Sequence, residues 1–310
     1  MMIRSLCVSL LAVLSLSISS PQSGKPEATS LLGKPLYSAP LSAEALKTLE
    51  ANLASARAAY DKAPDDADAT IWLGRRTAYL GRYREAIEIF SRGIEEHPTD
   101  ARMYRHRGHR LITVRMLDRA VTDFSKAAEL VAGKADEVEP DGQPNARNIP
   151  TSTLNSNIYY HLGLAHYLSG NFEKAADAYR QCLTFSKNPD MLSATTHWQY
   201  MTLRRMNRTA EANALLAPIT PAMDIIENGS YHKLLMMYKG ASTPESLLGA
   251  GPGLDAVTIG YGVANWHLYN GRRARAALML GDIVEKNAAQ WPAFGYIAAE
   301  ADLARLQEKK

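Results

Sequence analysis

Small and aromatic residues recur among the polar positions of the chain at a spacing of 34 residues in the first two units. Positions 8, 20 and 24 of three units, starting at Ala67, 101 and Ser156, hold two small residues and an aromatic one: Gly74, Ala86 and Phe90; Gly108, Ala120 and Phe124; Gly163, Ala175 and Tyr179. Small residues let the two helices of a unit approach closely, and the aromatic fills the space toward the next unit. An ordinary helical bundle shares the apolar stripes but not the fixed period, so the pattern predicts a helical repeat.

The pattern weakens toward both ends of the chain but continues. Further units are expected near 193–223 and 257–290, separated by an irregular segment at 224–256. Helices at 42–66 and 291–310 would cap the two ends, and a capping helix has one face in water. The expected organisation is thus 1–19 signal, 20–41 linker, 42–66 cap, 67–134 first two units, 135–155 insert, 156–290 remaining units and 291–310 cap.

These residues resemble the tetratricopeptide-repeat family, which places small residues at positions 8, 20 and 27, an aromatic at 24 and proline at 32. Gly93 and Cys182 stand at position 27, and Pro98 stands at position 32. The resemblance implies an all-α, right-handed superhelical solenoid of antiparallel helix pairs.

The C-terminal part is similar in a looser way to a periplasmic tetratricopeptide lipoprotein that acts as an adaptor for a protease and cell-wall endopeptidases. The matching residues are Tyr238-Lys239-Gly240 and Pro244 to Leu248. This resemblance implies an adaptor function. The lipid-acceptor cysteine of that protein has no counterpart here, so the resemblance does not extend to lipid attachment.

The first residues predict export. Arg4 supplies a positive charge, Leu6 to Ile18 form an apolar run, and Ser17-Ile18-Ser19 offer small residues for a peptidase. This is typical of a cleaved secretory signal peptide, with a mature start near Ser20 and a loose linker to 41. A retained N-terminal anchor is the alternative. We therefore expect a periplasmic or secreted protein with no stable membrane span after signal removal.

Composition and charge add limits. The chain is 46% hydrophobic and 22% charged, as in folded soluble proteins. Its net charge of +3 is too small to indicate nucleic-acid binding. Without the signal, Cys182 is the single cysteine, which excludes an internal disulfide and suggests a packed thiol.

Motifs for chemistry are weak. Gly249 to Gly253 lacks the spacing of a phosphate loop, and no nucleophile–base motif occurs in the sequence. His106 and His109 lie three residues apart without a carboxylate or cysteine nearby, which makes a poor metal site. The sequence therefore predicts no enzyme activity, no cofactor and no metal.

The candidate binding residues come from the family's architecture, in which positions 2, 5, 9 and 12 of the first helix face a concave groove. In this chain these positions give the peptide-groove candidates Arg75, Arg102, Arg105, His109, Tyr160 and Tyr167. Arginine and tyrosine are enriched at binding hot spots. The family's carboxylate clamp is not expected, because Ile71 and His106 replace its lysine and asparagine. A merely solvated helix face is the alternative.

Together these features predict a scaffold or adaptor that binds a protein or peptide partner, including an acidic segment. The insert carries Asp136, Glu137, Glu139 and Asp141, which could act as a lid on Arg102, Arg105 and His109. Two alternatives stay open: an enzyme or metal-binding protein with a site in 224–256, and a structural element of an envelope assembly.

Overall fold

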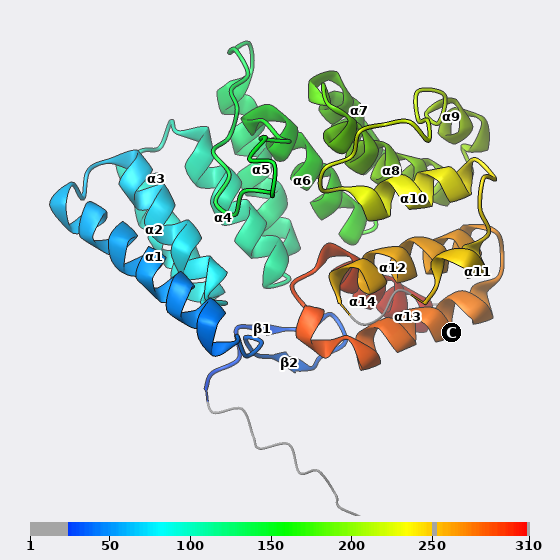
Figure 1. Ribbon diagram of the computed structural model, residues 1–310, viewed down its shortest axis with the longest axis horizontal. Helices are drawn as coiled ribbons and strands as arrows, with labels where there is room; N and C mark the ends of the chain where they lie inside the picture. Colours follow the sequence, from blue (N-terminus) through cyan, green and yellow to red (C-terminus); the bar gives the residue numbers. More distant parts are fainter. Residues whose placement is uncertain (1–23, 250–252, 309–310) are drawn as a thin grey trace, which may run out of the picture.

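The computed structural model describes residues 24–249 and 253–308, and the regular secondary structure within them is mostly α-helix (Figure 1). The expected signal at 1–19 lies outside these residues. The helices are α1 (Ala43–Lys62), α2 (Ala67–Tyr79), α3 (Tyr83–Glu96), α4 (Ala101–Thr113), α5 (Leu117–Val131), α6 (Leu154–Leu168), α7 (Phe172–Phe185), α8 (Pro189–Arg205), α9 (Thr209–Ala214), α10 (Gly229–Tyr238), α11 (Pro244–Leu247), α12 (Leu254–Tyr269), α13 (Arg273–Lys286), η1 (Ala288–Gln290) and α14 (Phe294–Glu308). None of the described helices is long and apolar enough to cross a membrane.

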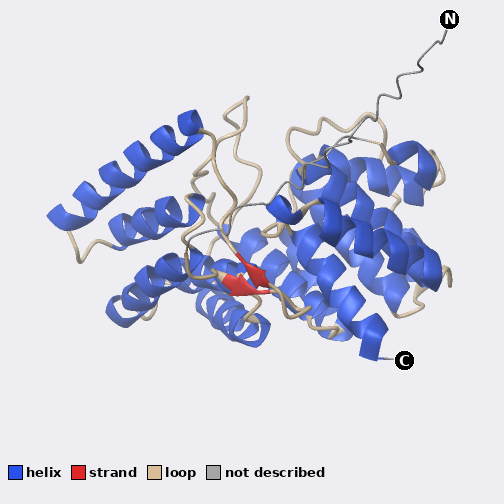
Figure 2. Cartoon of the chain, turned by 90° about the horizontal axis from the view of Figure 1, so that it is seen from below, coloured by secondary structure: helices blue, strands red, loops and turns tan. Residues whose placement is uncertain are grey.

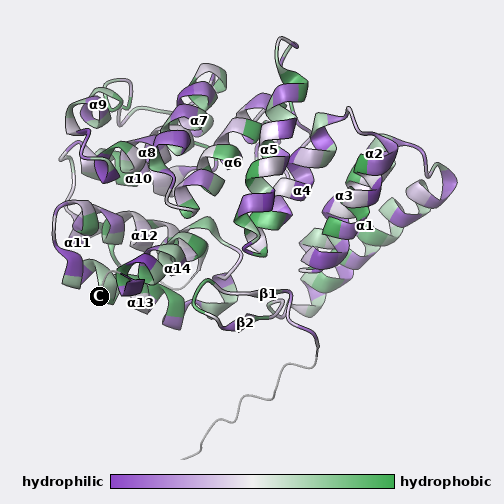
Figure 3. Ribbon diagram, turned by 180° about the vertical axis from the view of Figure 1, so that it is seen from behind, coloured by the Kyte–Doolittle hydropathy of each residue, from purple (hydrophilic) through white to green (hydrophobic). Residues whose placement is uncertain are grey.

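Consecutive helices pack as pairs, and α2, α4, α6 and α8 also contact one another in that order along the row. Each of these four helices begins at a residue whose side chain accepts a hydrogen bond from the backbone of the first turn: Asp66, Asp100, Thr153 and Asn188. Such caps satisfy donors that a helix leaves unpaired. Helices α2 to α5 carry both hydrophobic and hydrophilic stretches (Figure 3), as expected of amphipathic helices packed in a row.

The recurring glycines explain the close approach within each pair. A Cβ atom on Gly74 would lie 2.5 Å from the ring of Phe90, and one on Gly163 would lie 2.7 Å from Tyr179. Gly108 stands in the same relation to Phe124, at 2.9 Å. The small residue at position 8 and the aromatic at position 24 therefore belong to one contact, repeated three times.

The turn between paired helices needs a residue in the left-handed region. Its φ angle is +77° at Gly81, +82° at Gly170 and +78° at Gly271, but Arg115 occupies the same place at +65°. A residue with a Cβ atom pays roughly 1–2 kcal/mol for this conformation. Arg115 offsets the cost through its side chain, which donates to both carboxylate oxygens of Glu300 at 3.0 Å.

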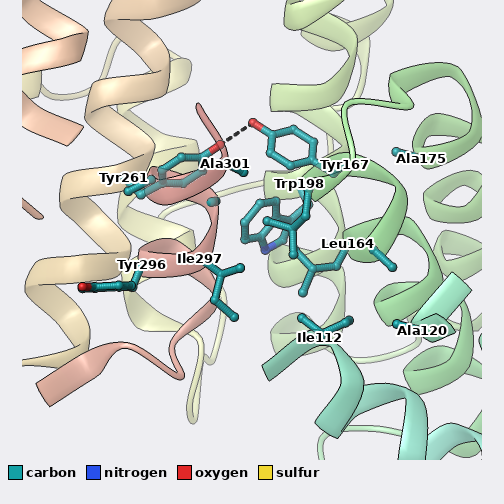
Figure 4. Packing of buried hydrophobic residues seen from close by; sticks show 14 of the residues in the cluster. Ile112, Ala120, Leu164, Tyr167, Ala175, Trp198, Tyr261, Tyr296, Ile297 and Ala301 are labelled. Atoms are coloured by element: carbon teal, nitrogen blue, oxygen red, sulfur yellow. Dashed lines mark hydrogen bonds between the residues drawn. The ribbon is translucent and has the colours of Figure 1, made fainter. Parts of the chain in front are cut away.

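The solenoid curves back on itself, so that its last helix lies inside the molecule. In α14 every residue from 295 to 302 is buried, because the helix packs against α6, α12 and α13. Figure 4 shows Leu164 and Trp198 of the central helices facing Ile297 of α14 and Tyr261 of α12. The expectation of a C-terminal cap with one face in water is therefore wrong for α14.

The segment before α1 is also part of the core rather than a loose linker. Residues Ala28–Thr29 (β1) and Pro35–Leu36 (β2) form a small antiparallel hairpin, which lies between the two halves of the molecule (Figure 2). Ala28 and Leu36 are buried in the main hydrophobic cluster, and the Trp291 indole donates to the Tyr37 carbonyl at 2.6 Å. These contacts correct the expectation of a flexible linker for its described residues, 24–41.

Candidate functional site

Four arginines on α2 and α4 form what we call the basic wall: Arg75, Arg76, Arg105 and Arg110. Three of them, without Arg76, line a cavity of about 180 Å³ together with Tyr79 and His109. The guanidinium groups of Arg75 and Arg76 also lie over the ring of Trp72, at 4.4 Å and 4.9 Å from its centre. Stacking of this kind holds the long side chains in place.

The insert, residues 135–155, places one carboxylate against this wall. Glu139 Oε2 lies 2.9 Å from Arg105 Nε, and its Oε1 lies 3.6 Å from His106 Nε2. The Asn157 amide of α6 donates to the same carboxylate at 3.1 Å. Because Glu139 and Arg105 are both buried, this ion pair is shielded from solvent.

The backbone of the insert follows the wall beyond Glu139. Arg75 donates to the Pro140 carbonyl at 2.8 Å, and Arg76 donates to the Gly142 carbonyl at 2.9 Å. The other three acids of the insert bond elsewhere: Asp136 and Asp141 accept from backbone groups, and Glu137 bonds through its backbone carbonyl to the start of α6. The insert thus runs along the arginines as an extended chain with one paired carboxylate.

The far end of the insert is tied to the segment before α10. Asn145 and Thr151 each donate to the Glu227 carboxylate at 2.7 Å. Arg147 forms an exposed ion pair with Asp224 at 2.8 Å. The insert therefore spans from α2 to the segment before α10.

The structure places the six predicted groove residues in three different settings. Arg75, Arg105 and His109 share the cavity of the basic wall. Arg102 lies apart, because its guanidinium is paired with Asp100 and Asp68, each at 2.6 Å. Of the three residues expected beneath an acidic lid, only Arg105 is paired with an acid of the insert.

Tyr160 and Tyr167 are not available in an open groove. Tyr160 is 6% exposed and its ring contacts Phe294, whereas Tyr167 is fully buried and shares a hydrogen bond of 2.7 Å with Tyr261. The expectation of an accessible groove at these two tyrosines is wrong, because α12 and α14 fill the space in front of α6.

Within the described residues, Arg105 is the only arginine of the wall that forms an ion pair: Arg75 and Arg76 donate to carbonyl groups, and Arg110 bonds to an imidazole. Burial lowers the pKa of Arg110 to about 10, so the group remains charged at neutral pH. Its nearest bonded partner is His109 Nδ1 at 2.7 Å, and no ion pair joins it to a carboxylate within 24–249 or 253–308. Burial and the neighbouring arginine charge lower the pKa of His109 well below its usual value, so this imidazole is neutral.

Sequence reasoning missed Arg76, Arg110 and the specific role of Glu139. Both arginines stand at position 10 of their units, directly after the predicted position 9. The pairs Arg75-Arg76 and His109-Arg110 were therefore a visible signal. Nothing in the sequence distinguished Glu139 from its acidic neighbours.

A second cavity, of about 290 Å³, is lined by residues of the 224–256 segment, where a hidden catalytic site was the alternative. It holds Ser230, Asp255 and His109. Ser230 donates directly to Asp255 at 2.7 Å instead of to an imidazole, so these three residues do not form a nucleophile–base relay. No group of three or more metal-ligating side chains was found in the described part of the chain.

Cys182 is a packed thiol. It is fully buried, and burial raises its pKa to about 12. The sulfur contacts the Ser156 carbonyl and the Thr195 hydroxyl, both at 3.3 Å. A thiol with a raised pKa in such surroundings is a poor nucleophile.

Comparison with known proteins bears on the fold. The family model of the tetratricopeptide repeat matches residues 156–189, which cover most of α6 and all of α7. A search of curated protein sequences gave no match.

Among the solved structures that match, two tetratricopeptide-repeat proteins are similar at a low level. One is the crystal structure of YrrB, described as a tetratricopeptide-repeat protein with an unusual peptide-binding site; it is 14% identical, with 82% of this chain and 98% of that chain covered and a TM-score of 0.44. The other is the tetratricopeptide-repeat domain of P58(IPK), at 14% identity, with 85% and 95% covered and a TM-score of 0.24. Similarities at this level say nothing about what this chain binds.

The similarity to this family therefore rests on the repeated helix pairs and not on the two solved structures. The matched pair α6–α7 packs a glycine against an aromatic ring, and the pairs α2–α3 and α4–α5 repeat that contact. Residues 156–189 match the tetratricopeptide repeat, and the rest of the solenoid is similar to that family in its paired helices.

Proposed function

We propose that this protein is a non-enzymatic scaffold or adaptor that binds an acidic segment of a protein partner at the basic wall, in an extracytoplasmic compartment. One observation carries the proposal: the arginines of the basic wall already bind an extended acidic stretch of the chain itself. A surface that binds an extended segment through arginine side chains is suited to bind a similar segment of another protein.

The proposed place of action is supported by the N-terminal sequence alone. The apolar run at Leu6 to Ile18 with its single preceding arginine supports export. Mass spectrometry of protein recovered from outside the cytoplasm should show an N-terminus near Ser20. An intact Met1 on such material would contradict cleavage, and retention in the cytoplasm would contradict export.

The binding surface can be tested by photocrosslinking in the native cell envelope. A photoreactive phenylalanine analogue at Tyr79 lies in the cavity, and the same analogue at Leu278, which is 68% exposed on α13, is the matched control. We expect one discrete adduct from position 79 only, lost when Arg75 and Arg110 are both replaced by glutamate. Adducts from both positions, or an adduct that survives the charge reversal, would contradict the proposal.

A further inference from the structure

Residues 139–142 of the insert, Glu-Pro-Asp-Gly, lie along the basic wall, and three of the four bond to it. The carboxylate of Glu139 occupies the space between Arg105, His106 and Asn157. These three side chains come from α4 and α6. They surround a single carboxylate, so they favour an acidic residue at this position over a neutral one.

The next residue contributes its backbone rather than its side chain. Arg75 donates a hydrogen bond to the Pro140 carbonyl, and a proline has no backbone N–H that would need a partner there. The wall therefore contacts the second residue of the segment only through its backbone carbonyl, which every residue type has. Proline lowers the entropy lost when an extended segment binds.

The third residue borders a cavity that three arginines of the wall also line. Asp141 lines the same cavity as Arg110 and Arg75, and no ion pair joins it to an arginine. A carboxylate beside a cavity lined by Arg75, Arg105 and Arg110 is favoured over a neutral side chain by their summed positive charge. An acidic residue is thus favoured here by charge rather than by a fixed contact.

The fourth residue is restricted by space. A Cβ atom on Gly142 would overlap the Tyr79 hydroxyl and lie 2.8 Å from Arg75 Nη2. Arg76 takes the Gly142 carbonyl at 2.9 Å, which holds the backbone at this short distance from α2. Only glycine fits the fourth position without moving the wall.

We propose that the basic wall recognises an extended Glu-x-Asp-Gly segment of the partner, and that residues 139–142 occupy the site as an intramolecular copy of it. This inference rests on the proposed function and adds the pattern that the partner must carry. Since the insert is tethered beside the wall, it competes at a high effective concentration, and a partner binds only by displacing it.

The test uses a synthetic peptide with the sequence of residues 136–145, labelled for fluorescence anisotropy, and the full mature chain. The receptor carries Glu139→Gln and Gly142→Ala, which remove the ion pair of the insert and its fit against Tyr79. A second receptor, Glu139→Gln alone, serves if the double variant unfolds. Three peptide controls separate pattern from charge: Glu→Gln at the first position, Gly→Ala at the fourth, and a scrambled peptide with the same net charge.

We expect the parent peptide to bind the double variant at least tenfold more tightly than it binds the wild type. The Glu→Gln, Gly→Ala and scrambled peptides should each bind the double variant at least tenfold more weakly than the parent does. Arg76→Gln in the receptor, which removes the donor to the fourth carbonyl, should weaken the parent peptide severalfold.

The outcomes that overturn the inference are distinct. Equal binding of the parent and scrambled peptides, lost on Arg76→Gln, would leave an acidic binding surface but remove the Glu-x-Asp-Gly pattern. Equal binding to wild type and double variant would show that the insert does not occupy the site. If no acidic peptide binds any receptor, the pattern and the proposed function both fail.

Discussion

Helices α4 and α6 occupy equivalent places in neighbouring units, yet different parts of the chain pack against them. Arg105 and His109 of α4 border a cavity that the insert enters, whereas Tyr160 and Leu164 of α6 are buried against α14 and its neighbours. The repeat register assigns both sets to the concave side. What lies in front of each helix depends on the C-terminal helices, which fold back over α6 and leave the basic wall to the insert.

A buried charge pair joins the half of the molecule that α14 closes to the half with the basic wall. Glu300 is fully buried, and its carboxylate accepts hydrogen bonds from two nitrogens of Arg115 and from the Leu31 backbone N–H. It therefore links the second unit, α14 and the N-terminal hairpin. Glu300→Ala leaves Arg115 buried without its partner, and we expect a loss of about 3–5 kcal/mol in the free energy of unfolding. Urea denaturation measures it.

Glu173→Ala is the control, because Glu173 is exposed and its ion pair with Arg208 contributes little. If Glu300→Ala lowers stability no more than Glu173→Ala does, the closure of the solenoid is not held by this carboxylate.

The glycine–aromatic contacts should be equally important in both halves. Gly74→Ala and Gly163→Ala each force a methyl group into an aromatic ring, and we expect a loss of roughly 1–3 kcal/mol from either. Gly281→Ala is a matched control, since a Cβ atom there meets nothing within 4 Å and alanine favours the helix. Thermal unfolding of the three variants decides; a Gly281 variant as unstable as the others would argue against the packing explanation.

We expect acid to destabilise the half of the molecule that α14 closes, because it contains buried neutral imidazoles. Burial lowers the pKa of His197 to about 3, and its ring stacks on Tyr231 and Tyr238. The unfolded chain binds a proton near pH 6.5 and the folded one does not, so stability is lost as the pH falls from about 6.5 toward 3. We expect His197→Phe to reduce this slope by up to about 1.4 kcal/mol per pH unit.

Urea midpoints at pH 7.5 and 5.5 measure the slope. The half-exposed His232, replaced by glutamine, provides the comparison. A slope that His197→Phe leaves unchanged would show that this imidazole takes up a proton in the folded chain.

The smallest effect is expected at the exposed end of the insert. Arg147 and Asp224 form a solvent-exposed ion pair, which screening makes weak. Asp224→Asn should leave the unfolding midpoint unchanged within error at physiological salt. A clear drop would mean that the insert stabilises the fold as a whole, instead of lying on it as a displaceable segment.

The helix pairs could be predicted from the local sequence, but the return of α14 onto α6 could not. Gly74 and Phe90 predict their own contact because the repeat period fixes their spacing, and Gly170 and Gly271 occupy turns for the same local reason. The return of α14 onto α6 depends on contacts between residues far apart in the chain, such as Arg115 and Glu300. No period or motif encodes such a pair.

The candidate site, too, could be predicted from the sequence only in part. Arg75, Arg105 and His109 follow from their repeat positions, and the acids of the insert could be read as a possible cover. The choice of Glu139 among four acids, and the steric restriction at Gly142, arise from the path of the loop against Tyr79. Tyr160 and Tyr167 were misjudged because their burial comes from helices about 100 residues or more away in the sequence.

Hydrogen exchange with and without the peptide of residues 136–145 tests the central claim most directly, namely that an acidic segment binds the basic wall in place of the insert. In the wild-type chain at a saturating peptide concentration, backbone exchange should become faster in residues 136–149, because the insert is displaced. Exchange in residues 158–168 should stay unchanged, because α14 covers that face of α6. Unchanged exchange in the insert together with altered exchange in 158–168 would contradict the account.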